Sequence, residues 1–174
     1  MGNHQLMTAL CGALLAMSAM ANGIHAGGDA HGHEGDAIGK PGVAAKVSRT
    51  VKIEMSDSMR FSPARIAVKQ GETIRFTVKN SGQIKHELVL GTEQALKAHD
   101  ELMKKYPGME HDEPNMVTVA PGKTGTVIWQ FTHAGRVDFA CLQPGHYDAG
   151  MQGEVMVTGT KSPAKSDGHT DPTH

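Results

Sequence analysis

A thiol, an imidazole and a thioether lie close together near the end of this sequence. Within the stretch CLQPGHYDAGM, four residues separate Cys141 from His146 and another four separate His146 from Met151. A trigonal copper site combines two imidazoles and one thiolate in a plane with a weak thioether on the axis. The stretch provides three of these donors, so a second imidazole has to come from elsewhere. One cysteine and two histidines also suit zinc, and the alternative without metal is a buried cysteine beside a surface turn.

Strands are expected on both sides of these donors. Cys141 ends the expected strand 135–141 and the next expected strand is 153–158, so the three donors lie on one turn between neighbouring strands. Alternating apolar and polar residues, separated by turn signals, predict further strands near 46–55, 64–69, 72–79, 84–90, 116–120 and 124–131. Short strands at such regular spacing predict an all-β fold, a Greek-key sandwich of two antiparallel sheets.

The middle of the chain supplies the missing imidazole and one helix. His86 lies in the expected strand 84–90, just after the turn Asn80-Ser81-Gly82, at an end of the sheet where loops gather. Residues 93–106 are rich in helix formers, with apolar residues near helical spacing and Pro107-Gly108 directly after them. We expect this insertion to form a helix across one end of the sandwich.

His86, Cys141, the tripeptide Pro144-Gly145-His146 and Met151 together resemble the cupredoxins, the blue copper proteins such as azurin, plastocyanin and auracyanin. The resemblance covers about 51–158. It implies one type 1 copper, with His86, Cys141 and His146 as equatorial ligands and Met151 as the axial ligand.

The chain departs from the common cupredoxin pattern at two points, and the second indicates which group of cupredoxins it resembles most. Many cupredoxins follow the first ligand histidine with asparagine, whose side chain ties two loops together, whereas this chain has Glu87. Residues near a ligand orient it and tune the metal, so this change bears on the properties of the site. The inserted helix and the histidine-rich leader are similar to the exported cupredoxins associated with bacterial copper tolerance, the CopI type, and that match is closer than the match to azurin.

The ends of the chain predict export and two flexible segments. Residues 1–21 have the apolar run and small-residue cleavage site of a signal peptide, with a second cleavage site after Ala26, so we expect a periplasmic protein whose only cysteine is Cys141. Residues 22–42 are rich in histidine and glycine and are expected to be flexible, either collecting additional copper loosely or only solubilising the chain. Residues 43–158 form the expected cupredoxin domain, and 159–174 a second flexible tail.

Methionine and histidine in the insertion form a candidate secondary copper site. Met109, His111 and Met116 carry donors that favour Cu(I), although methionine also fills gaps beneath loops, and the sequence leaves both interpretations open. His99 and Met103 lie four residues apart on the expected helix and are assigned to packing or surface. Trp129 alternates with apolar neighbours and is assigned to the core.

The net charge of the chain and the residues on either side of Cys141 argue against several classes of function. The formal net charge of −1 gives no broad field for nucleic acid or an anionic membrane, and no membrane span is expected in the mature protein. Cys141 is flanked by Ala140 and Leu142 instead of the histidines that relay electrons in multicopper oxidases, which argues against an enzyme of that kind. The resemblance to the CopI-type cupredoxins implies a copper-tolerance protein that binds copper or transfers electrons, with copper ions and a redox or copper-handling protein as partners. The alternatives are a one-electron carrier to a respiratory partner and a Cu(I)-oxidising enzyme.

Overall fold

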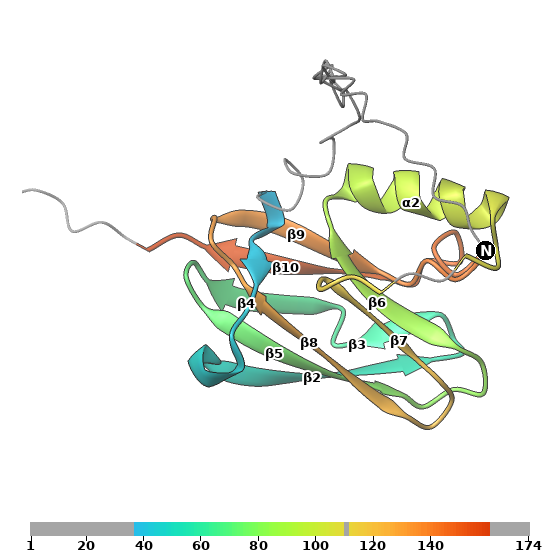
Figure 1. The fold of residues 1–174 in the computed structure, drawn as a ribbon, viewed down its shortest axis with the longest axis horizontal. Helices are drawn as coiled ribbons and strands as arrows, with labels where there is room; N and C mark the ends of the chain where they lie inside the picture. Colours follow the sequence, from blue (N-terminus) through green and yellow to red (C-terminus); the bar gives the residue numbers. More distant parts are fainter. Residues whose placement is uncertain (1–36, 110–111, 161–174) are drawn as a thin grey trace, which may run out of the picture.

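The computed structural model of the protein describes residues 37–109 and 112–160, which form a β-sandwich with one long helix (Figure 1). The first sheet contains, in spatial order, β1 (Lys40–Pro41), β8 (Thr124–Gln130), β5 (Thr73–Asn80), β2 (Arg49–Ser56) and β3 (Arg60–Ser62). The second sheet contains, in the same manner, β4 (Arg65–Lys69), β10 (Gln152–Thr158), β9 (Gly135–Ala140), β6 (His86–Gly91) and β7 (Met116–Val119). A short 3-10 turn, η1 (Ala44–Lys46), joins β1 to β2. The expected β-sandwich with an inserted helix is confirmed.

Both sheets are mixed, so the prediction of two antiparallel sheets was wrong in part. β2 pairs in parallel with β5, and β10 pairs in parallel with β4, whereas the other pairings are antiparallel. After β2 and β3 the chain crosses to β4 in the second sheet, and it then re-enters the first sheet with β5 running in the direction of β2. Alternation along a strand indicates which face is buried, but it carries no information on the direction of the neighbouring strand.

Alternating side chains from the two sheets fill the space between them. Phe61 packs edge-on against Phe139 with ring centroids 5.0 Å apart, and Phe76 does the same with Phe131 at 6.1 Å. Edge-to-face aromatic pairs of this kind add to the free energy gained from burial. Cys141 and Met151 belong to the same apolar cluster, so the candidate ligands lie at one end of the core.

Helix α2 (Glu93–Lys105) lies against the second sheet, next to β6 and β9 (Figure 1). Thr92 begins the helix, because its hydroxyl accepts a hydrogen bond from the backbone N–H of Ala95 at 3.1 Å. The buried face of the helix contributes to a second apolar cluster. This cluster consists of Val89, Leu96, Met103, Met116, Ala140, Leu142 and Tyr147. The helix is thus packed against residues on either side of Cys141.

The β-sandwich includes residues before position 43, where the sequence placed the start of the domain. Trp129 Nε1 donates a hydrogen bond to the carbonyl oxygen of Ile38 at 2.8 Å, and β1 pairs with β8. Both Ile38 and Trp129 are buried, as predicted for Trp129. Residues 38–41 are therefore part of the sandwich, although the sequence placed them in the flexible segment.

Several predictions fall outside the described residues. These are the signal peptide, most of the histidine-rich segment, His111, and the C-terminal tail from residue 161 onward. Within the described ranges, no helix is long and apolar enough to cross a membrane.

Candidate metal centre

The loop between β9 and β10 folds back on itself and brings its two ends together. The backbone N–H of Cys141 donates to the carbonyl oxygen of Met151 at 3.0 Å, and the N–H of Met151 donates to that of His146 at 3.0 Å. Gly145 and Gly150 adopt φ angles of +82° and +87°, a region that side chains with a Cβ disfavour. The sequence therefore closes this loop through glycine turns and backbone hydrogen bonds.

His86 comes from the second sheet and completes a group of three donors. The Sγ atom of Cys141 lies 3.2 Å from Nδ1 of His146 and 4.0 Å from Nδ1 of His86, and all three donors lie within 4.8 Å of one another. Bonds from a metal ion to imidazole nitrogen and thiolate sulfur are about 2.0–2.3 Å long, which separates donors in a trigonal plane by roughly 3.5–4 Å. The three side chains therefore fit around one ion.

Met151 is the fourth predicted ligand and has no exposed surface. Its backbone is hydrogen-bonded to the backbone of both Cys141 and His146, so these three residues are neighbours in the folded loop. Two imidazoles, one thiolate and a neighbouring thioether are the donor set of a type 1 copper site. The chemistry of these residues thus fits copper.

Burial sets the protonation of the donors before a metal binds. Removal from water raises the pKa of the Cys141 thiol to about 12, even though the N–H of Glu87 donates to its sulfur at 3.4 Å. The thiol therefore keeps its proton at neutral pH, and a bound metal ion displaces that proton. Burial, together with the neighbouring His86, lowers the pKa of His146, so its ring is neutral and has a free lone pair.

Asp57 orients the buried histidine, and its sequence context does not predict this contact. Its Oδ1 atom lies 3.0 Å from Nε2 of His86, and its Oδ2 atom accepts the backbone N–H of Gln83 at 2.7 Å. Asp57 lies in the turn after β2, 29 positions before His86. A polar residue between two serines looks like an ordinary turn residue, so no local signal marks it.

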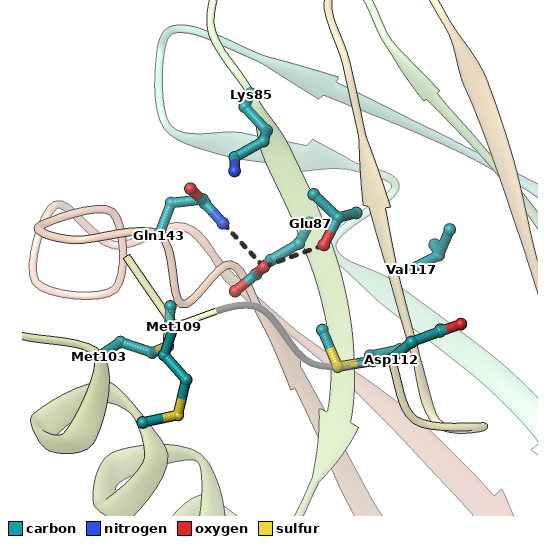
Figure 2. A pocket seen from close by; sticks show the side chains of 9 residues that line it. Lys85, Glu87, Met103, Met109, Asp112, Val117 and Gln143 are labelled. Atoms are coloured by element: carbon teal, nitrogen blue, oxygen red, sulfur yellow. Dashed lines mark hydrogen bonds between the residues drawn. The ribbon is translucent and has the colours of Figure 1, made fainter. Parts of the chain in front are cut away.

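Glu87 connects β6 of the second sheet to the loop between β9 and β10, which carries three of the predicted ligands and is called the ligand loop below. One carboxylate oxygen accepts the backbone N–H of Leu142 at 3.0 Å, and the other accepts the side-chain amide of Gln143 at 2.9 Å and the hydroxyl of Thr118 at 3.4 Å (Figure 2). Glu87 is buried beside the site. The position that holds asparagine in many cupredoxins thus keeps a connecting role here with a different side chain.

The structure brings two of the three residues of the candidate secondary site to one pocket. Met109 and Met116 line one pocket, and Met103, which the sequence assigned to packing or surface, lines it as well (Figure 2). His111 lies outside the described residues, so its part in this site stays a prediction.

Comparison with known proteins decides the family. Residues 47–158 match the family model described as copper binding proteins of the plastocyanin/azurin family. The chain belongs to this family of copper-binding cupredoxins. It is 51% identical over 150 residues to the copper-resistant cuproprotein CopI of Rubrivivax gelatinosus, an alignment that covers 83% of this chain and 91% of the relative. It is 37% identical over 175 residues to the protein of the same name from Pseudomonas aeruginosa PAO1, and this alignment covers 84% of this chain and 91% of the relative. The predicted resemblance to CopI-type cupredoxins is confirmed.

Solved cupredoxin structures share the fold. A reduced auracyanin from Roseiflexus castenholzii superimposes with a TM-score of 0.56 at 26% identity, covering 64% of this chain and 98% of the auracyanin. Auracyanin B superimposes with a TM-score of 0.57 at 22% identity, covering 69% of this chain and 96% of auracyanin B. The cofactor of this cupredoxin is accordingly copper, and the His86, Cys141 and His146 cluster is the candidate site for it.

Proposed function

We propose that this cupredoxin is a periplasmic type 1 copper protein that contributes to copper tolerance by binding copper, transferring electrons, or both. His86, Cys141 and His146 are its equatorial ligands and Met151 is its axial ligand. The observation that carries the proposal is the convergence of three donor atoms within 4.8 Å at the end of the core. The name of the relatives, copper-resistant cuproprotein, supports the link to tolerance.

When bound in such a site, copper exchanges single electrons between Cu(II) and Cu(I). The chain holds the donors in place by itself: Asp57 orients His86, Glu87 fixes the backbone after Cys141, and the loop is closed by its own hydrogen bonds. Such preorganisation limits the rearrangement that accompanies a change in charge. His146 is only partly buried, so it is the ligand most accessible to a redox partner.

The accessible edge of His146 also supports a second candidate function, a one-electron carrier to a respiratory partner. Deletion of the gene distinguishes the role in copper tolerance from the role as an electron carrier. Copper-sensitive growth that is rescued by the wild type and not by Cys141→Ser supports tolerance. Impaired respiration without copper sensitivity supports the carrier and contradicts the tolerance role. Fractionation of the same cells tests the periplasmic location, because the mature protein should be released with the periplasmic contents.

The ligand set is tested by titrating the purified mature protein with Cu(II) and following visible absorption and EPR. We expect an intense thiolate-to-copper band that is lost in Cys141→Ser. The matched control is His133→Gln, because His133 is an exposed histidine of the turn before β9, and this variant should keep the band. A colourless complex with an ordinary EPR spectrum in the wild type would contradict the type 1 site.

A further inference from the structure

A pocket lined by sulfur atoms lies next to the candidate type 1 site. It is open to solvent and has a volume of about 520 Å³, far more than the roughly 30 Å³ of one water molecule. Met103, Met109 and Met116 line it, and its charged lining residues are Lys85, Glu87 and Asp112. An ion from solution can therefore reach the methionine side chains.

The three methionines come from three different parts of the chain. Met103 is on α2, Met109 follows the helix, and Met116 begins β7. Figure 2 shows the side chains of Met103 and Met109 next to each other, near Glu87 on β6. Met103 and Met116 are 4% and 7% exposed, whereas Met109 is 39% exposed, so the group extends from the protein interior to the rim of the pocket.

Thioethers are soft donors that select Cu(I), and they bind it without losing a proton. Glu87 and Asp112 contribute two carboxylates to the pocket and Lys85 one ammonium group, so the lining keeps an excess of one negative charge, which favours a cation over an anion. Met103 and Met116 also pack in the apolar cluster beneath α2, so their burial alone does not require a metal. Met109 is exposed, and it lines the same pocket as the other two.

Glu87 separates this pocket from the type 1 site. Its side chain lines the pocket and accepts the N–H of Leu142, while its own N–H donates to the sulfur of Cys141. One residue therefore contacts both the pocket and the ligand loop.

We infer that the pocket formed by Met103, Met109 and Met116 is a second metal site, selective for Cu(I), adjacent to the type 1 copper. The inference rests on the proposed copper function, and it assigns to the inserted helix the task of holding a second ion. Met103 is a donor that the sequence did not suggest, and a contribution from His111 stays a prediction.

NMR of the mature full-length chain, carrying ¹³C-methyl methionine, tests this inference residue by residue. Cu(I) is added under anaerobic conditions, and single Met→Leu variants assign the signals. The first Cu(I) should shift the methyl signal of Met151, which reports the type 1 site. Further Cu(I) should shift the signals of Met103, Met109 and Met116. During this second addition, the signals of Met55 in the core and Met156 on the surface should not move, because neither lines the pocket.

The Cu(I) stoichiometry is then measured by competition with a Cu(I) chelator. The variant Met103→Leu/Met109→Leu/Met116→Leu keeps side-chain volume and should lose the second Cu(I) while keeping the thiolate-to-copper band. The control Met55→Leu/Met156→Leu, which also replaces one buried and one exposed methionine, should bind as the wild type does. A shift of Met151 alone would overturn the second site and leave the type 1 site intact. A shift of the pocket methionines without Met151 would contradict the type 1 assignment instead.

Discussion

The carboxylate of Asp57 lies 3.0 Å from Nε2 of His86, at the ring nitrogen opposite the one that faces the sulfur of Cys141. The backbone N–H of Gln83 and the ring of His86 both lower the pKa of Asp57, so this carboxylate is ionised at neutral pH. A charged acceptor at Nε2 holds the proton there and leaves the lone pair of Nδ1 free for the metal. Asp57 is therefore a positioning residue for the proposed ligand His86, which has no exposed surface.

Replacing Asp57 by asparagine keeps an acceptor oxygen and removes the charge. We expect Asp57→Asn to weaken Cu(II) binding by about 10- to 100-fold, the usual effect of losing a residue that supports a metal ligand. The reduction potential should rise, because the negative charge favours Cu(II) over Cu(I). Competitive Cu(II) titration and potentiometry measure the two effects.

The control for this variant is Glu54→Gln, which removes the same charge from an exposed position on β2. It should leave both quantities close to those of the wild type. Equal changes in the two variants would show that overall charge, and not the contact with His86, is responsible.

Glu87 gives a prediction about stability. In Glu87→Leu the N–H of Leu142 loses its acceptor, and an unpaired buried N–H costs about 1–3 kcal/mol. Glu87→Gln retains an acceptor oxygen and should be clearly more stable than Glu87→Leu. Urea unfolding of the metal-free proteins measures the difference, and equal stability of the two variants would rule out the role assigned to this hydrogen bond.

The sequence predicted most of the scaffold because alternation and turn residues are local signals. β5 alternates in burial along most of its length, and the helix combines helix-forming residues at helical spacing with the turn Pro107-Gly108 after its end. β1 and β3 were missed, since strands of two and three residues are too short to show alternation. The parallel pairings were missed because they depend on where the chain crosses between the sheets.

The proposed ligands could be suggested from the sequence for a different reason. Cys141, His146 and Met151 lie within one short loop, so their spacing is visible in the sequence, and His86 was suggested by its place at the end of a sheet. The structure brings the donors of His86, Cys141 and His146 together. Asp57 was not predictable, because its contact with His86 is formed only when the turn after β2 packs against the start of β6. The connecting role of Glu87 likewise depends on Leu142, 55 positions away.

Lys104 connects α2 to the ligand loop. Its ammonium group lies 2.8 Å from the buried carboxylate of Asp100 and 2.9 Å from that of Asp148, which follows His146 by two positions. Within the described residues, Oδ1 of Asp100 has no hydrogen-bond partner, so Lys104 provides the main compensation for this carboxylate. Lys104→Met should therefore leave a buried charge without a counterion, which is strongly destabilising.

The matched control is Lys97→Met, because Lys97 forms a similar pair with Glu93 four positions earlier on the same helix, where both side chains are exposed. Exposed pairs contribute little to stability. We expect the loss in free energy of unfolding to be several times larger for Lys104→Met, and Asp100→Asn should restore most of it. Similar losses in the two lysine variants would contradict this account.

Gly82 provides a test of Asp57 that leaves the charge in place. A Cβ atom at Gly82 would overlap with Oδ1 of Asp57, so Gly82→Ala must push the carboxylate away from His86. We expect the same weakening of Cu(II) binding and the same rise in reduction potential as in Asp57→Asn. In the double variant the two effects should not add, because both act through one contact. The control is Gly108→Ala, where an added Cβ meets nothing within 4 Å. Additive effects in the double variant would mean that Gly82 and Asp57 influence the copper site independently.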